Sequence, residues 1–309
     1  MKLLSDHLLN LNEYALCKGF IFPIDSIKKG TYIETATYLD FYKNLIFKMQ
    51  DEYFGLHFGF FLNLKALGSV YDISLATTNI GQTINLWSDY SDNNFPIVKF
   101  NSYVKENRFY LELSSEIEDL HIRNHILDTI FTFVYRELKL MLKNEDITIH
   151  LPFENLDVYS KWFDDKIKYY DKHSFSFKES ILDNEINTNS KKTIELLLPK
   201  FLIMLESKEY RNKKFSVLVR KMVLNMCNPE LPNLEQVANQ FLVTERTLQR
   251  RLKIEEMSYR IITNDIKKEL AFYLKKGKKI KTKDIAYILG YSSSSSFLHA
   301  NQNWIQKSI

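Results

Sequence analysis

Two hydrophobic patterns alternate along the first two thirds of the chain. Apolar side chains three and four positions apart, as in "TATYLDFYKNLIFKM", are typical of an amphipathic helix. Apolar and polar side chains take turns in "PIVKFNSYVKENRFYLELSS", which predicts a β-hairpin with Asn107 in its turn. From about residue 211 only the helical pattern continues. We therefore expect an α+β part, with helices and a small antiparallel sheet, followed by an all-α part.

The same patterns predict the remaining elements of the first part. "NHILDTIFTFVYRELKLMLK" predicts a long apolar helix, whereas "DITIHLPF" and "KHSFSFKES" predict short strands of the same antiparallel sheet. Another helix is expected over residues 191–205. The charged stretch 206–214 then marks a boundary between two domains, residues 1–208 and residues 209–309.

Short helices with brief joints in the second part are typical of helix-turn-helix units. In "LEQVANQFLVTERTLQRRL", Val237 and Ala238 would face inward from the first helix, and Leu248 and Leu252 from the second. Thr244 is a competent N-cap for that second helix. Its outward positions carry Arg and Gln, the side chains that pair with guanine and adenine edges in the major groove. These positions are Arg246, Gln249, Arg250 and Arg251.

The pattern recurs 48 residues later, where Ile285-Ala286 matches Val237-Ala238 and Gly290 falls in the turn. A run of five serines follows. We interpret this run as the start of a helix rather than as a linker, with Ser292 or Ser293 as its N-cap. Phe297 and Trp304 would be its inward anchors. Ser294 and Ser295 would either contact phosphate or bases, or only complete the first turn.

Charge separates the two parts as clearly as the hydrophobic pattern does. Residues 211–309 hold 19 Lys and Arg against 8 Asp and Glu, a net charge of +11, and the rest of the chain has a net charge of −7. Four of the nine arginines lie between Arg246 and Arg260. A surface of solvated lysines would give the same sum, but the arginine cluster favours a polyanionic partner.

Three stretches carry a resemblance to the AraC/XylS family of bacterial transcription activators: "VANQFLVTERTLQRRLK", "SYRIITNDIKKELAFYLKKG" and "IKTKDIAYILGYSSSSSFLHA". The resemblance implies two helix-turn-helix units, about 234–253 and 282–304, joined by a linker helix over 259–276. It implies that both units bind successive major grooves of promoter DNA. The implied DNA-binding residues are Thr244, Arg246, Thr247, Gln249, Arg250, Arg251, Ser293, Ser294, Ser295, Leu298 and His299.

A second resemblance lies upstream, in "YFGLHFGFFLNLKALGSVYDISLATTNIGQTINLWSDY". This stretch looks like the arabinose-binding-type regulatory domain of one branch of the same family. The resemblance implies a small-molecule effector, contact with RNA polymerase, and a homodimer. Two other readings stay open: a ligand-independent regulator whose first domain only dimerises, and an enzyme with an appended DNA-binding domain.

The second unit departs from the family pattern at two positions. Asn301 stands where an apolar aromatic side chain normally packs, so either it finds a partner or the unit is loosely packed; an unpartnered buried amide would cost ~1–3 kcal/mol. His299 stands where the family usually has an arginine, which removes a permanent charge and a bidentate donor.

Other candidate chemistry is weaker. His121 and His125 have metal-ligand spacing but no third ligand, so we expect no metal site. "GLHFG" lacks the residues of a phosphate loop and is interpreted as a tight helix crossing. The aromatic side chains around it, together with Trp87, would line either a pocket or the core. We expect no catalytic residues and no cofactor. The N-terminus lacks a signal-peptide core, which predicts a cytoplasmic protein.

Overall fold

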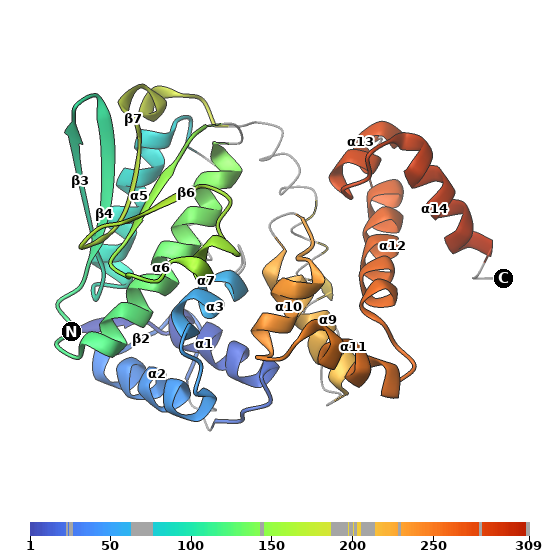
Figure 1. Cartoon of the computed structure of the whole chain (residues 1–309), viewed down its shortest axis with the longest axis horizontal. Helices are drawn as coiled ribbons and strands as arrows, with labels where there is room; N and C mark the ends of the chain where they lie inside the picture. The colour runs from blue at the N-terminus through green and yellow to red at the C-terminus, as the bar shows by residue number, and fades with distance from the viewer. Residues whose placement is uncertain are drawn as a thin grey trace. The chain divides into compact units, whose positions relative to one another are not determined.

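The computed structural model describes residues 1–22, 24, 27–62, 77–142, 145–186, 197, 200, 203–204, 214–227, 230–277 and 280–306. The chain divides into two compact units, Met1–Lys191 and Lys192–Ile309 (Figure 1). Residues 206–213, most of the predicted boundary, lie outside the described residues, as does most of the helix predicted over 191–205.

A five-stranded sheet forms the first unit's scaffold, in the order β3-β4-β7-β5-β6. Its strands are β3 (Lys99–Lys105), β4 (Arg108–Ser114), β5 (Thr148–Leu151), β6 (Lys166–Tyr169) and β7 (His173–Lys178). The hairpin between β3 and β4 turns at Glu106 and Asn107, both with positive φ (52° and 59°), which matches the twist of the flanking strands. The predicted hairpin and both predicted strands are therefore confirmed.

The sheet differs from the prediction in one strand. β6 was not predicted, and it pairs with β5 in the parallel direction, so the sheet is mixed rather than antiparallel. Parallel neighbours need a crossover of a dozen or more residues. Residues 152–165, which include helix α7 (Asp157–Ser160), provide that connection.

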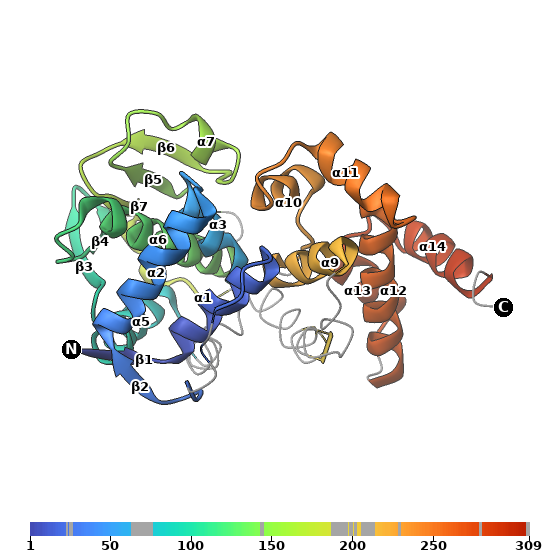
Figure 2. The ribbon, with the colours of Figure 1, turned by 90° about the horizontal axis from the view of Figure 1, so that it is seen from below.

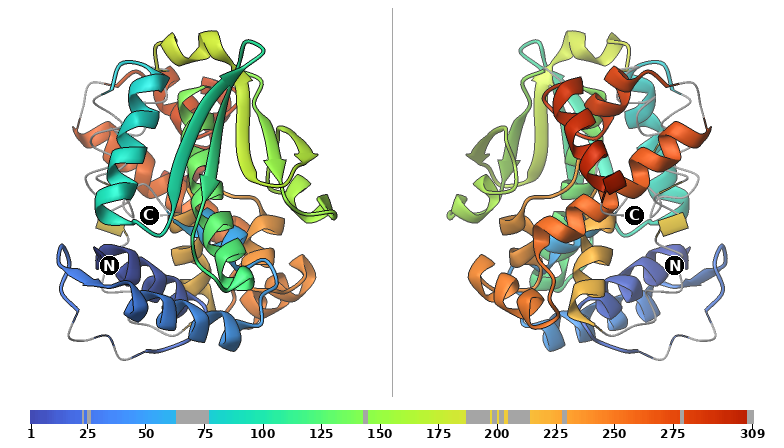
Figure 3. Two further views of the ribbon diagram at one scale, coloured as in Figure 1. Left: turned by 90° about the vertical axis from the view of Figure 1, so that its left-hand side faces the viewer. Right: turned by 90° about the vertical axis from the view of Figure 1, so that its right-hand side faces the viewer.

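The predicted long helix is α6 (Leu120–Met141), which packs against one face of the sheet (Figure 3). Phe131 of α6 stacks on Phe175 of β7 with ring centroids 4.0 Å apart. Helix α3 (Phe54–Phe61) packs closely along the same stretch of α6, because a Cβ at Gly55 would lie 2.1 Å from the His125 carbonyl oxygen. At Gly59 a Cβ would lie 2.6 Å from Thr132 Cβ. The interpretation of "GLHFG" as a tight crossing is confirmed.

The described residues of the first unit also form helices α1 (Asp6–Cys17), α2 (Thr35–Met49) and α5 (Ile80–Asn94), with a short 3-10 turn, η2 (Glu179–Asp183). A two-stranded sheet of β1 (Lys2–Leu4) and β2 (Tyr32–Glu34), which was not predicted, ties the N-terminus to the start of α2. Phe54, Phe58 and Phe61 are buried core, whereas Tyr71 lies outside the described residues.

The second unit is helical over its described residues, apart from one isolated bridge residue. Its helices are α9 (Phe215–Met226), α10 (Leu234–Gln240), α11 (Glu245–Ile254), α12 (Tyr259–Gly277), α13 (Thr282–Ile288) and α14 (Ser294–Gln306). Helix α9 lies alongside α10 and α11 (Figure 2). The expected change from an α+β part to a helical part is confirmed. Among all described helices, none combines the length and apolarity that crossing a membrane requires.

Candidate nucleic-acid interface

The first helix pair, α10 and α11, is held by caps at both helix starts. Asn233 Oδ1 accepts from the Gln236 amide at 2.8 Å, and Gln236 Oε1 accepts in return from the Asn233 amide at 3.0 Å. This capping box satisfies two amides that the helix leaves free. Thr244 Oγ1 accepts from the Thr247 amide at 3.2 Å and begins α11, as predicted.

The turn between the helices is a tight left-handed one. Leu242 has φ 53°, and the Val243 amide donates to the Ala238 carbonyl at 3.1 Å. Ala238 is 1% exposed, so the small side chain sits where the helices meet. Leu248 and Leu252 of α11 are fully buried, which confirms the predicted inner stripe.

The opposite side of α11 carries the predicted contact residues. Arg246 and Arg250 are exposed and four positions apart, and the half-buried Gln249 lies between them, so the three share one helix face. Thr244 is exposed and Thr247 is half-buried at the helix start. Within the described part of the chain, neither Arg246 nor Arg250 forms an ion pair. Two permanent positive charges therefore project from a helix whose other side is firmly packed.

Arg251 differs from its neighbours, because its guanidinium lies over the Phe215 ring of α9, 3.6 Å from the centroid. Glu255, one turn later, accepts from the amides of Phe215 and Ser216 at 2.8 and 2.9 Å. Burial raises the pKa of Glu255, but the hydrogen bonds from Ser216 and Phe215 outweigh it and leave that pKa lowered. The two side chains fasten the end of α11 to the start of α9. Sequence reasoning missed Glu255, since nothing local links it to residues about 40 positions earlier.

The second pair, α13 and α14, repeats this turn. The Tyr291 amide donates to the Ala286 carbonyl at 2.9 Å, and Gly290 has φ 71°, each 48 positions after its counterpart in the first pair. The N-cap of α14, however, lies one residue later than the 48-residue spacing from Thr244 predicts. Ser293 Oγ accepts from the Ser296 amide at 3.1 Å, and α14 begins at Ser294. Of the two predicted caps, Ser293 is the correct one, and the serine run does begin a helix.

Counting from the two caps aligns α11 with α14. Phe297 takes the place of Leu248 and is fully buried, 5.6 Å from the Tyr291 ring and 6.4 Å from the Trp304 ring. The outer positions differ more. Ser295, Leu298 and His299 occupy the places of Arg246, Gln249 and Arg250, and all three are exposed. Ser294 is half-buried. This helix face carries no permanent positive charge.

Asn301 takes the place of Leu252 and is half-buried. Lys275 Nζ from α12 donates to Asn301 Oδ1 at 2.8 Å and also lies 5.4 Å from the centre of the Phe297 ring. A second lysine of α12, Lys267, lies 4.8 Å from the centre of the Tyr291 ring. Asn301 therefore has a partner, which is the first of the two predicted alternatives. The linker helix supplies the cations that support the second pair.

Between α12 and α13 the sequence is rich in lysine. Lys276, Lys281 and Lys283 are exposed, and Lys278 and Lys279 lie outside the described residues. In the first unit, His121 and His125 have ring centroids 4.5 Å apart. His125 Nδ1 accepts from the Gly55 amide at 3.3 Å, and burial lowers the pKa of His125 to about 4. No cluster of three or more metal-binding side chains occurs among the described residues.

Comparison with known proteins finds similarity to bacterial transcriptional regulators. The chain is 35% identical over 88 residues to the HTH-type transcriptional regulator VqsM of Pseudomonas aeruginosa, and 30% identical over 92 residues to the ornithine utilization regulator of the same organism. These alignments cover 28% and 29% of this chain and 27% of each relative, so the chain matches about a quarter of their length. No family model matches the chain.

The crystal structure of the transcriptional regulator CdpR from Pseudomonas aeruginosa aligns with 97% of this chain and 95% of its own, with 18% identity and a TM-score of 0.48.

Proposed function

We propose that this chain is a sequence-specific DNA-binding transcription regulator. In this proposal α10–α11 and α13–α14 are helix-turn-helix units, and α12 joins them. The observation that carries the proposal is the exposed face of α11. Its three outward side chains, Arg246, Gln249 and Arg250, are of the types that read base edges, and the opposite side of the helix is buried.

Helix α11 would enter the major groove with its capped N-terminus toward the sugar-phosphate backbone. The free amides of a helix start and its partial positive charge favour a phosphate there, beside Thr244 and Thr247. Arg246, Gln249 and Arg250 would then reach base edges. Arg251 would have a different role in this arrangement. Its guanidinium contacts the Phe215 ring of α9 and so fixes the orientation of α11 relative to α9.

Helix α14 would bind the next major groove more weakly. Ser293, Ser294 and Ser295 at its start can donate to phosphate oxygens, and Leu298 can contact a thymine methyl group. His299 would contribute a hydrogen bond without a permanent charge. The net charge of +11 after residue 210 supports phosphate contacts across this unit.

The regulatory features of the proposal rest on the resemblance alone. They are control by a small-molecule effector bound to the first unit, activation through RNA polymerase, and assembly as a homodimer in the bacterial cytoplasm. The alternative in which the first unit only dimerises is distinguished from the sensor by direct ligand binding. The enzyme alternative would be tested first at His57, His121 and His125. The His57 and His125 side chains are buried, and their Nδ1 atoms are hydrogen-bonded to Asp51 Oδ2 and to the Gly55 amide.

A double substitution on α11 tests the proposal. Full-length Arg246→Ala/Arg250→Ala protein should bind its DNA site at least about thirtyfold more weakly, because each base contact contributes ~1–3 kcal/mol. Lys105→Ala, which removes an exposed lysine from the first unit, is the charge control and should leave the affinity unchanged. Fluorescence anisotropy with labelled duplex measures both. Equal affinities for wild type and double variant would refute the proposed role of α11.

A further inference from the structure

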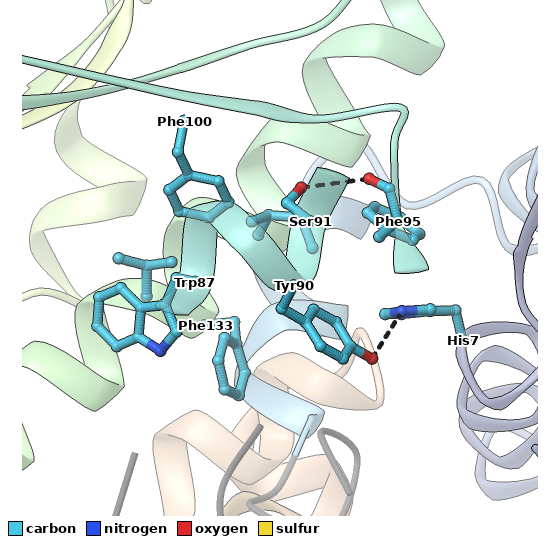
Figure 4. Close-up of a pocket in the computed structure, with 9 residues that line it drawn as sticks. His7, Trp87, Tyr90, Ser91, Phe95, Phe100 and Phe133 are labelled. Carbon is cyan, nitrogen blue, oxygen red and sulfur yellow. Dashed lines mark hydrogen bonds between the residues drawn. The ribbon is translucent and has the colours of Figure 1, made fainter. Parts of the chain in front are cut away.

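The two faces of the five-stranded sheet differ in charge. On the α6 side, Phe131 stacks on Phe175, and a cavity lined by Trp87, Phe100 and Phe133 lies between α1, α5, α6 and the start of β3 (Figure 4). None of the described residues that line this cavity is Asp, Glu, Lys or Arg. The α6 side of the sheet is therefore apolar, and the charged side chains of the strands point the other way.

The pairing of the strands identifies the residues on the side away from α6. Phe175 faces α6, so its neighbour Ser176 points to the opposite side. A row of paired residues crosses the sheet through Ser176 and shares that side: Tyr103, Tyr110, Ser176, Thr148 and Lys166. Four strand spacings separate its ends, about 19 Å in total. We call the basic side chains of β4, β7, β5 and β6 on this side the basic face: Arg108, Lys178, His150, Lys166 and Lys168.

The positive charge of the basic face is not balanced by acidic side chains. Lys166, Lys168 and Lys178 are exposed, and neither they nor Arg108 form an ion pair with a described residue. Burial lowers the pKa of His150, and the charges of Lys168 and Arg108 lower it further, so the positive potential extends to the middle of the face. Residues 1–210 together have a net charge of −7, which makes this excess of cations a local feature.

The acidic side chain on this side of β4, Glu112, has partners of its own. It is 5% exposed, and its carboxylate accepts from Lys172 Nζ at 2.8 Å and from the Tyr103 hydroxyl at 2.9 Å. The second bond fixes the Tyr103 ring, which stacks on Tyr110 with centroids 5.0 Å apart and planes 5° from parallel. Because β3 is an edge strand, no strand lies beyond the other side of that ring, and Tyr103 is 38% exposed. Another flat ring can extend the stack there.

We infer that the basic face, with the Tyr103 ring at the edge of the sheet, binds a single-stranded nucleic acid. A base would stack on the free side of Tyr103, and phosphates along the same strand would lie over Arg108, Lys166 and Lys168. Proteins that bind single strands combine a basic surface with aromatic rings in this way. An acidic polypeptide would use the cations but not the ring. This binding goes beyond the proposed role of α11 and does not depend on it.

Two oligomers of equal length, oligothymidylate and its abasic analogue, separate base stacking from charge, because they carry the same phosphates. Anisotropy titrations use full-length Arg246→Ala/Arg250→Ala protein, in which the two exposed arginines of α11 are absent. Oligothymidylate should bind at least about fivefold more tightly, since even one stacked base contributes that much.

Substitutions of Tyr103 in the same background test whether the preference arises at the sheet. Tyr103→Ala should abolish it, whereas Tyr103→Phe keeps the ring and should retain it. Tyr32→Ala is the matched control, because Tyr32 is 53% exposed and is hydrogen-bonded to Asn94 elsewhere in the unit. This control should keep the preference.

The cations are tested by the dependence of affinity on salt. Lys166→Ala/Lys168→Ala should weaken binding of both oligomers alike and reduce the slope of log affinity against log salt by about 1.4, because each phosphate contact on a single strand contributes about 0.7. Lys28→Ala/Lys29→Ala removes two exposed lysines that precede β2 and should leave the slope unchanged.

Crosslinking of the wild type locates the bound strand even if a variant fails to fold. An oligomer that contains 5-iodouracil should crosslink under ultraviolet light to Tyr103. Four results would overturn the inference: equal binding of the two oligomers, a preference that survives Tyr103→Ala, crosslinks confined to the second unit, or competition by polyglutamate as strong as that by oligothymidylate. None of these experiments contains duplex DNA, so their failure is separate from a failure of duplex binding by α11.

Discussion

The two helix pairs of the second unit have the same kind of turn, but the helix after the turn exposes different side chains in each pair. Both have a buried alanine, a left-handed residue and a hydroxyl cap, at Ala238, Leu242 and Thr244 in one pair and at Ala286, Gly290 and Ser293 in the other. The first presents two arginines and a glutamine on a helix with two buried leucines. The second presents serine, leucine and histidine on a helix whose second inner position is an asparagine. The turn fixes how the two helices of a pair are arranged, and the side chains after the cap determine which chemical groups the second helix exposes.

The largest expected difference between the pairs concerns their cores. Leu252→Ala should destabilise the first pair by ~2–5 kcal/mol, because it opens a cavity under α11. Asn301→Ala should cost only ~1 kcal/mol, since it removes one hydrogen bond to an exposed lysine. Hydrogen exchange of the α11 and α14 amides in the full chain measures both losses. A larger loss for Asn301→Ala would mean that the second pair depends on its polar contact.

The next difference concerns DNA affinity. Arg250→Ala should weaken binding to the specific site by ~1–3 kcal/mol, roughly five- to 150-fold, through the loss of a base contact. His299→Ala at the equivalent position of α14 should change affinity less than about threefold, because the exposed side chain that is lost carries no permanent charge. Anisotropy titrations at one salt concentration compare them. Similar losses would show that both helices read bases.

The caps should behave alike. Thr244→Ala and Ser293→Ala each remove one side-chain oxygen from a helix start, and each should cost ~1 kcal/mol of stability in its own pair. Local hydrogen exchange in the first turns of α11 and α14 reports the two costs separately. If removing a cap does not reduce the local stability, other contacts hold the first turn of that helix.

The smallest effect is expected at Arg251. Arg251→Ala removes a cation–π contact with Phe215 that contributes ~0.5–1 kcal/mol at an exposed site. Arg250→Ala should reduce the salt dependence of DNA binding only if that arginine contacts phosphate, whereas Arg251→Ala should leave it unchanged. Titrations at several salt concentrations measure the slopes. If Arg251→Ala reduces the dependence of DNA affinity on salt concentration, Arg251 contacts a phosphate of the DNA.

The junction that Arg251 shares with Glu255 should also depend on pH. Because the pKa of Glu255 is lowered in the folded chain, its contribution is present above its ordinary value and is lost as pH falls through the lowered one. Thermal melts between pH 7 and pH 3 should therefore show a smaller decline for Glu255→Gln than for the wild type. Equal declines would mean that this carboxylate is not coupled to folding.

Features fixed by neighbouring residues were predictable from the sequence. The Thr244 cap, the Asn107 hairpin and the glycines of "GLHFG" each depend on a short stretch whose side chains permit one local geometry. The linker helix that the resemblance implies over 259–276 is found at Tyr259–Gly277.

Features that depend on distant contacts were not predictable. The parallel pairing of β6 and the β1–β2 sheet join segments whose own patterns do not specify a partner. Arg251 has the same local pattern as Arg250, and only the position of Phe215 separates their environments. Likewise the partner of Asn301 comes from α12, 26 positions earlier, where no sequence signal marks Lys275.

In vitro selection from random duplex DNA, with full-length protein at two salt concentrations, shows directly whether α11 reads a DNA sequence. We expect one strongly conserved block that is lost in Arg246→Ala/Arg250→Ala protein. A weaker block should lie about 10 base pairs away, one helical turn along, where α14 binds the next groove. No enrichment, together with binding that disappears as salt rises, would leave only a cationic surface without sequence readout and would contradict the account.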